Sequence, residues 1–290
     1  MKVLISADSS CLIKNQAFTN YNIKIFPLNV IIDGKEYLDG VTINQEMLGS
    51  CMRANKNIKT STPPLGEVID YFENIFNEGY DYVIHFTISS KLSSMFNLFT
   101  NVAKQHFAGK ITVIDSYSLS AAMLNNVLYA YEEVEKGTSI DDIVNAIEER
   151  KKHMDFFFVP ENLTALKNGG RISPAVALIG NAIGIKPVIA LKDGELIKEE
   201  MTRKTKKTFV DRAIALIQRF PVADYDYTVI SFDVAAEKLD RIMNALNEVV
   251  DKSIIINAII PINAAAHSGP GTIGLIVSPK INGKSLNDYK

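Results

Sequence analysis

Hydroxyl-bearing residues gather in four short segments, of which three follow apolar runs and one, Lys59 to Pro63, leads into a predicted helix. They are Ala7-Asp8-Ser9-Ser10, Lys59-Thr60-Ser61-Thr62-Pro63, Phe86-Thr87-Ile88-Ser89-Ser90 and Ile114-Asp115-Ser116. Hydroxyls, together with free backbone N–H groups where a helix begins, are neutral donors suited to a carboxylate or a phosphate. The same side chains also serve as helix N-caps, which is their commonest use. Capping explains any one segment, but several segments at one sheet edge favour an anion site.

Two further positions bring charge or an imidazole to a small-residue environment. Arg171 follows Gly169 and Gly170, and such paired glycines permit positive φ and a close backbone approach. A helix end followed by a new N-cap accounts for the glycines but not for the arginine. His267 lies among alanines and glycines, in a predicted loop between two strands. That loop leaves room for a ligand beside the imidazole, although a lone histidine is more often structural.

A cluster of cations covers Thr202-Arg203-Lys204-Thr205-Lys206-Lys207 and opens a predicted helix that runs to about Arg219. Positive charge in a first turn opposes the helix dipole, but only by tenths of a kcal/mol per residue. The cluster is therefore either a solvated face or a site for an anion or a partner. Both interpretations stay open.

Several familiar motifs fail on their context. Gly269-x-Gly271-x-x-Gly274 matches the dinucleotide fingerprint, but a strand follows it and too few residues remain for a βαβ unit. The sequence contains neither a Walker A motif nor a GxSxG elbow. Its four histidines and two cysteines lack metal-ligand spacing. We therefore expect no metal, no cofactor and no catalytic residue.

The elements that must position these residues alternate between short apolar runs and helical periodicity. Strands are predicted at 3–7, 23–32, 82–87, 111–114, 156–159, 187–191, 227–232, 253–260 and 273–277. Ile140, Ile143, Val144 and Ile147 show helical spacing behind a cap at Ser139. This alternation predicts an α/β fold with mainly parallel sheets covered by helices. The charged helix that ends near residue 150 divides the chain into predicted α/β domains at 1–150 and 151–290.

Composition limits the function classes. The 290 residues are 47% hydrophobic and 22% charged, with a formal net charge of −2. A near-neutral chain has no overall attraction to nucleic acid or an anionic membrane, so we expect no nucleic-acid partner and at most transient membrane contact. The N-terminus lacks the apolar stretch of a signal peptide, and no run is long enough to span a bilayer. We expect a cytoplasmic protein.

Taken in order, the motifs resemble those of the DegV family over essentially the whole chain. They are Asp8-Ser9, Thr60 to Pro63, Ile88 to Ser93, Asp115-Ser116, Gly169 to Ser173, Ile185 to Pro187, Arg203 to Lys207 and His267 to Gly271. Each motif is weak alone, but eight in the family's order are specific.

The resemblance implies a two-domain α/β protein that holds one long-chain fatty acid in a pocket at the domain junction. Family members that act as binding subunits of bacterial fatty-acid kinases hold the acyl chain while a separate catalytic subunit phosphorylates its carboxylate. By this resemblance, the side chains around the carboxylate are Thr60, Ser61, Ser89, Ser90, Ser93 and His267. Arg171 and Arg203 match arginines linked to the phosphorylated head group and to kinase docking.

The apolar lining and the chemistry stay open at this point. Residues suited either to the lining or to an ordinary core are Phe72, Phe76, Met95, Phe96, Leu98, Phe99, Leu119, Met123, Ile179 and Ile183. One alternative function is a stand-alone acyl hydrolase or transferase, with Ser90 or Ser93 as nucleophile and His267 as base. Another is an interaction module that uses the cations from Arg203 to Lys207. Because no residue set forms a recognisable triad, we expect a lipid carrier that is not itself an enzyme.

Overall fold

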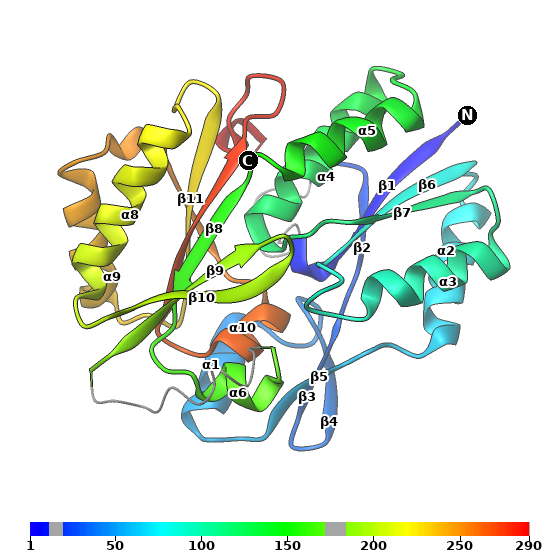
Figure 1. Cartoon of the computed structure of the whole chain (residues 1–290). Helices are drawn as coiled ribbons and strands as arrows, with labels where there is room; N and C mark the ends of the chain where they lie inside the picture. Colours follow the sequence, from blue (N-terminus) through cyan, green and yellow to red (C-terminus); the bar gives the residue numbers. More distant parts are fainter. Residues whose placement is uncertain (12–19, 172–183, 290) are drawn as a thin grey trace.

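Two β-sheets that differ in strand direction form the frame of the molecule (Figure 1). The computed structural model describes residues 1–11, 20–171 and 184–289. A third, smaller sheet lies below the other two in Figure 1. Helices pack on and between the sheets, so the predicted α/β class is confirmed.

The first sheet is parallel throughout. Its strands, in spatial order, are β2 (Ile23–Phe26), β1 (Val3–Asp8), β6 (Tyr82–Thr87) and β7 (Ile111–Asp115). Parallel pairing brings the carboxyl ends of the strands to one edge. There the backbone N–H of Ile88 donates to Asp8 Oδ2 at 2.7 Å, and that of Ser116 donates to the Thr87 carbonyl at 3.1 Å. The hydroxyl-rich segments after β1, β6 and β7 are therefore neighbours, as the sequence predicts.

The second sheet corrects the expectation of mainly parallel sheets. Its strands, in spatial order, are β10 (Glu195–Thr202), β9 (Lys186–Lys192), β8 (Asp155–Val159), β13 (Thr272–Pro279), β11 (Tyr225–Phe232) and β12 (Ile255–Ile259). Among these six strands only β11 and β12 pair in parallel. The turn between β9 and β10 has positive φ at Asp193 and Gly194, as tight hairpin turns require. β8 and β9 also pair in antiparallel fashion, and two further antiparallel pairs arise because β13 returns between β8 and β11.

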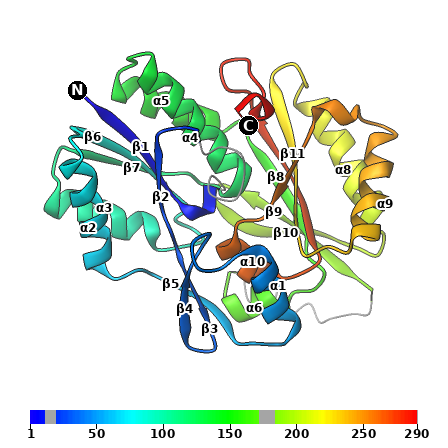
Figure 2. The ribbon, with the colours of Figure 1, turned by 180° about the vertical axis from the view of Figure 1, so that it is seen from behind.

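Burial on both faces explains why these strands resemble parallel ones in sequence. Successive side chains of a strand point to opposite faces. Phe156 and Phe158 belong to the core shared with the first sheet, whereas Phe157 faces the helices α8 (Thr205–Arg219) and α9 (Ala236–Asn247). These two helices cover the outer face of the sheet in Figures 1 and 2. Continuous apolar runs are typical of parallel strands only because those are usually buried on both sides.

The small third sheet arises where the predicted strand at 23–32 divides in two. Pro27 separates β2 from β3 (Asn29–Ile32), and proline has no N–H to donate to a ladder. β3 pairs in antiparallel fashion with β4 (Lys35–Leu38) and with β5 (Ile58–Ser61). Thr60 and Ser61 therefore lie at the end of a strand and not in the predicted loop.

The remaining helices connect and cover these sheets. They are α1 (Gln45–Arg53), α2 (Leu65–Asn77), α3 (Met95–His106), α4 (Ser120–Glu135), α5 (Ile140–Lys151), α6 (Thr164–Gly169) and α10 (Ile262–Ser268), with short 3-10 turns η1 (Ser9–Cys11), η3 (Lys252–Ile254) and η4 (Leu286–Tyr289). α4 contacts both β1 and β13 and so joins the two large sheets, while α10 contacts β3, β5 and α6. One core continues across this junction. The predicted domain division near residue 150 stays a prediction. In the described part of the chain, no helix is long and apolar enough to cross a membrane.

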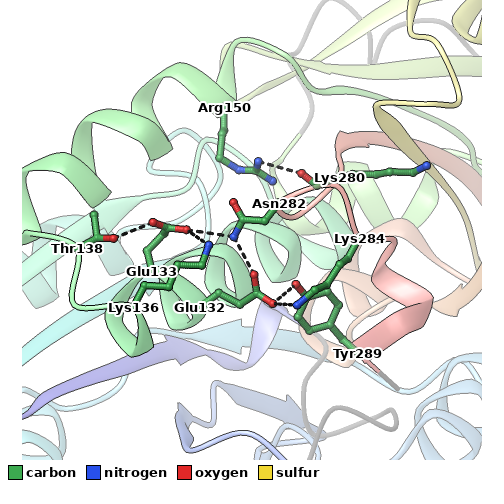
Figure 3. A network of polar contacts seen from close by, with 9 residues as sticks. All are labelled: Glu132, Glu133, Lys136, Thr138, Arg150, Lys280, Asn282, Lys284 and Tyr289. Atoms are coloured by element: carbon green, nitrogen blue, oxygen red, sulfur yellow. Dashed lines mark hydrogen bonds and ion pairs between the residues drawn. The ribbon is translucent and has the colours of Figure 1, made fainter.

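A polar network fastens the C-terminal segment to α4 (Figure 3). Glu132 accepts hydrogen bonds from Asn282 Nδ2 at 2.7 Å, from Lys284 Nζ at 2.7 Å and from the Tyr289 hydroxyl at 2.5 Å. Burial alone would raise the pKa of Glu132, but these donors outweigh it and hold the pKa at about 2. The Arg150 guanidinium donates to the Lys280 carbonyl at 3.2 Å. The network holds the end of β13 against α4 and α5, and so fixes the junction of the two sheets.

Candidate functional site

A largely apolar cavity lies between the first and second sheets. Its free volume, counting space open to solvent, is about 840 Å³. Its apolar lining comes from strands of the second sheet and from helices and connecting segments around the first: Leu28, Ile88, Leu92, Met95, Leu119, Phe156, Phe158, Leu166, Leu196, Ile230, Ile260 and Ala264. Because Ile88 and Leu92 follow β6, the cavity is adjacent to the carboxyl end of that strand, where α/β sheets usually bind their ligands.

Among the described residues, only two of the apolar side chains proposed from the sequence line this cavity. Met95, at the start of α3, and Leu119, just before α4, do so. Phe72 and Phe99 are fully buried in the core beside the first sheet. Ile179 and Ile183 lie outside the described residues. Periodicity identifies a buried face, but it does not distinguish a face that meets a neighbour from one that meets a cavity.

One end of the cavity is polar, and five predicted site residues meet there. Thr60, Ser61, Ser93, Arg171 and His267 all line it. Thr60 Oγ1 and His267 Nε2 are 2.9 Å apart and share a hydrogen bond. The chain thus brings together side chains that are as much as 207 residues apart in the sequence.

His267 is carried by α10 and not by the predicted loop. Its ring packs against Gly169, at the end of α6, so closely that a Cβ on Gly169 would lie 2.0 Å from His267 Nδ1. Burial, reinforced by the positive charge of Arg171, lowers the pKa of His267 to about 4. The imidazole is therefore neutral near pH 7, with one nitrogen as donor and the other as acceptor. A neutral histidine orients an anion by hydrogen bonding and not by charge.

Several buried polar atoms at this end have no partner in the part of the chain that the structure describes. Ser61 Oγ and His267 Nδ1 have none among residues 1–11, 20–171 and 184–289. The same is true of Asn29 Oδ1 and Ser268 Oγ, which belong to cavity-lining residues that we did not predict. Buried polar groups in native proteins are nearly always hydrogen-bonded, so four such atoms beside one cavity indicate a polar ligand group or water there.

The sequence analysis also missed two other polar lining residues, Thr272 and Asn263. Both of these side chains already donate hydrogen bonds to other protein groups. Thr272 Oγ1 donates to the carbonyls of Ser268 and Gly269, at 2.9 and 2.8 Å. Asn263, in the first turn of α10, donates to Asp39 Oδ2 through Nδ2 at 2.6 Å and through its backbone N–H at 3.2 Å. Asp39 thus fixes the start of the helix that carries His267. No sequence motif pointed to Asp39, because its partner lies 224 residues away.

Ser89 and Ser90 lie outside the cavity lining, contrary to our expectation. Ser89 is fully buried, and its hydroxyl donates to the carbonyl of Gly194 at 2.7 Å. The backbone N–H of Ser90 donates to Asp115 Oδ1 at 3.1 Å, and Ser90 lines a surface cleft next to the cavity. These serines connect the first sheet to the β9–β10 hairpin and to β7. Their predicted contact with a carboxylate has no geometric support.

The two arginines occupy different places. Arg171 is exposed at the polar end, where its Nε donates to the Leu92 carbonyl at 3.3 Å and its Nη1 donates to the Gly169 carbonyl. Leu92, Ser93, Arg171 and Leu196 line both the cavity and the surface cleft beside it. The polar end is therefore close to the surface. Arg203 is exposed between β10 and α8 and does not line the cavity.

Comparison with known proteins identifies the family. The sequence model described as "Uncharacterised protein, DegV family" matches residues 2–280. The chain belongs to the DegV family. A DegV domain-containing protein of Staphylococcus aureus (strain MRSA252) is 32% identical over 285 residues, which cover 96% of this chain and 99% of the relative. The resemblance drawn from the eight motifs is thereby confirmed.

Solved structures of DegV proteins share the fold over nearly the full length. The fatty acid binding DegV family protein of Streptococcus agalactiae has a TM-score of 0.84 and 27% identity, covering 97% of this chain and 99% of that one. A protein from Eubacterium ventriosum, described as binding stearic acid, has a TM-score of 0.83 and 26% identity, covering 97% and 99%. The two-domain α/β architecture expected for a DegV protein is the one found here.

Proposed function

We propose that this chain binds one long-chain fatty acid in the cavity between its sheets. The acyl chain lies against Phe156, Phe158 and Ile230, and the carboxylate lies at Thr60 and His267. The observation that carries the proposal is an apolar cavity with unpartnered polar atoms gathered at one end. The DegV structures described as fatty acid binding, with 26–27% identity to this chain, support it.

The energetics of such a complex come mostly from the tail. Burial of an alkyl chain gives roughly 0.8 kcal/mol per CH₂, so about fourteen methylenes contribute on the order of 11 kcal/mol before ordering costs. The carboxylate must still replace its water with donors, because an unsatisfied buried anion is expensive. Hydroxyl and imidazole groups supply part of these donors, and Arg171 lines the same end of the cavity. The head group therefore fixes orientation, while the tail supplies affinity.

The same geometry favours a carrier over the hydrolase alternative. A serine nucleophile requires a base within hydrogen-bond reach. His267 Nε2 instead bonds to Thr60, and Ser90 lies outside the cavity lining. Ser93 lines the cavity, yet no bond from Ser93 to an imidazole occurs in the described part of the chain. An active-site serine probe at high concentration is expected to leave the protein unlabelled.

Lipid analysis of the purified protein tests the binding proposal. Organic extraction of the folded protein, followed by mass spectrometry, is expected to release about one acyl chain per molecule. Protein that is delipidated and offered hexadecanoate should regain one equivalent and melt at a higher temperature, because a ligand that binds only the folded state stabilises it. Folded protein that contains no acyl chain and takes up none would refute the proposal.

We further propose that the bound carboxylate is presented to the catalytic subunit of a fatty-acid kinase, which forms an acyl phosphate. The cleft shared by Ser93 and Arg171 gives a partner access to the polar end. The exposed Arg203 serves the docking of this partner. Arg203→Ala is expected to keep hexadecanoate affinity within about twofold while kinase turnover falls at least about tenfold, the scale of one lost charged contact.

Arg241→Ala is the matched control for this experiment, because Arg241 is also exposed but lies on α9. It should leave both lipid binding and turnover unchanged. Turnover that is equal in wild type and Arg203→Ala would remove Arg203 from the docking surface and leave the binding proposal intact.

A further inference from the structure

Asn29 occupies an unusual position beside the polar end of the cavity. It opens β3, and it pairs in register with Ser61 of β5. Directly opposite residues of an antiparallel pair point to the same face, with Cβ atoms about 4.5–5.5 Å apart. Asn29 and Ser61 both line the cavity, and Asn29 is only 3% exposed. The two side chains thus form one polar patch on the cavity wall.

Asn29 is a buried polar residue in an otherwise apolar strand. Leu28, Val30 and Ile32 are buried and apolar, and asparagine is depleted in strands. Asn29 Oδ1 has no hydrogen-bond partner in the described ranges, and the opposite Ser61 Oγ likewise has none. Each such group costs roughly 1–3 kcal/mol when it stays unsatisfied. An apolar residue would avoid that cost, so the position requires an explanation beyond folding.

The chemistry of the patch fits a carboxylate. The unpartnered Oδ1 of Asn29 is itself an acceptor, but a half-turn of the carboxamide brings its two N–H donors to the same place. An ionised carboxylate offers about four acceptor positions for such donors. The other neighbours are already partly engaged: Thr60 bonds to His267, and Arg171 donates to the carbonyls of Leu92 and Gly169. A carboxylate at this end would therefore still need donors. Asn29 and Ser61 supply them from one strand pair.

We propose that Asn29 is a carboxylate-binding residue of this cavity, donating its side-chain N–H to the ligand opposite Ser61. The inference rests on the proposed fatty-acid binding and adds a residue that determines head-group specificity. An amide at this position distinguishes an anionic head group from a neutral one. It also does so without adding charge to a cavity that must remain apolar for the tail.

Two probes that share a tail test this role, hexadecanoate and hexadecan-1-ol. Asn29→Asp places a like charge beside the carboxylate, and we expect hexadecanoate to bind at least about 30-fold more weakly at about pH 8. Asn29→Leu removes the donor and should weaken hexadecanoate about tenfold. Hexadecan-1-ol should lose less than about threefold in either variant, since a neutral hydrogen bond is roughly half as strong.

Asn57→Asp is the matched control, because it adds the same charge at an exposed position before β5. It should leave both affinities unchanged. Equal losses for the two probes would show that Asn29 supports the tail or the fold, and unchanged hexadecanoate affinity in folded Asn29→Asp would also overturn the proposal. If wild-type protein binds neither probe, the proposed function itself fails, and this inference fails with it.

A measurement on the wild-type protein covers variants that fail to fold. With isotope-labelled asparagine, the side-chain amide resonance of Asn29 should move downfield when hexadecanoate is added. Hexadecan-1-ol should move it much less. An Asn29 amide resonance that is unaffected by saturating hexadecanoate would overturn the role.

Discussion

Ser89 and Ser93 belong to one short segment after β6, yet they serve different regions of the molecule. The Ser93 backbone N–H donates to the Ser89 carbonyl at 3.1 Å, so the two residues lie one turn apart. Ser93 lines the cavity together with Ser61 and His267, and the atoms Ser61 Oγ and His267 Nδ1 have no protein partner in the described part of the chain. Ser89 is bonded to the β9–β10 hairpin through Gly194.

This contrast separates binding from support. In the cavity region, the polar atoms that matter are those the protein leaves unsatisfied, since a ligand can complete them. In the supporting region, Ser89, Asp8 and Asp115 each take part in a hydrogen bond within the protein. Changes in the first region should therefore affect lipid affinity, and changes in the second should affect stability.

The largest effect on affinity is expected from Gly169→Ala. The new Cβ would lie 2.0 Å from His267 Nδ1 and 2.9 Å from Cε1, so the ring must move and its bond to Thr60 must break. Such overpacking costs about 1–3 kcal/mol, and we expect hexadecanoate affinity to fall by about 30-fold or more in a binding titration.

Gly170→Ala is the control for this prediction. Gly170 has a φ of +67°, and a Cβ there would meet no atom within 4 Å. The substitution should therefore lower stability through backbone strain and leave lipid affinity within about twofold, because it does not touch the imidazole. If the two variants lose affinity equally, displacement of the His267 ring is not the cause of the loss in Gly169→Ala.

Ser89→Ala tests the supporting region. It removes the buried hydrogen bond between the segment after β6 and the hairpin, and it leaves the Gly194 carbonyl without its donor. We expect the free energy of unfolding to fall by about 1–3 kcal/mol in denaturant titrations. Lipid affinity should stay within about threefold of wild type. A large loss of affinity without loss of stability would instead restore Ser89 to the carboxylate site.

Thr60→Val tests the cavity region by a nearly isosteric change. It keeps the volume of the side chain and removes the hydroxyl that bonds to His267 Nε2. We expect hexadecanoate affinity to fall about five- to tenfold, the worth of one hydrogen bond of about 1 kcal/mol, with little change in stability. An unchanged affinity by calorimetry would show that the Thr60–His267 pair does not orient the ligand.

Much of this arrangement follows from local sequence, and the remainder depends on contacts between distant segments. The apolar runs at 82–87 and 111–114 and the helices that begin at Ile140 and Thr205 are confirmed, because local periodicity determines them. The expectation of mainly parallel pairing was wrong for β13, because burial on both faces produces the same apolar run in either orientation.

The candidate site divides in the same way. Hydroxyl-rich segments predicted the sheet edge correctly, but they did not distinguish Ser89, which bonds to the hairpin, from Ser93, which lines the cavity. The sequence did not identify Asn29 as a site residue. A single asparagine in an apolar run indicates a polar patch only once Ser61 is known to lie opposite it. His267 was selected for its small neighbours, which lie on a helix that Asp39 fixes from the other half of the chain.

The smallest effect expected is a difference in pH dependence between the two regions. In the cavity, burial lowers the pKa of His267 from 6.5 to about 4. Between these two pH values, His267 is therefore mostly protonated in the unfolded chain and mostly neutral in the folded protein. This contribution is complete above the unfolded pKa and is lost as pH falls through 6.5 toward 4. In the supporting region, burial raises the pKa of Asp8 from 3.8 to about 6, and the contribution of Asp8 to stability is lost in the opposite direction, as pH rises through this interval.

When the pH is lowered from about 7.5 to about 5.5, wild-type protein should therefore lose about 1 kcal/mol more stability than His267→Gln, which cannot take up the proton. Asp8→Asn should instead lose more than wild type over the same interval, because it lacks the carboxyl that gains stability on protonation. Parallel pH profiles for wild type and both variants, measured by denaturant titration, would show that neither group is buried in the state assigned to it.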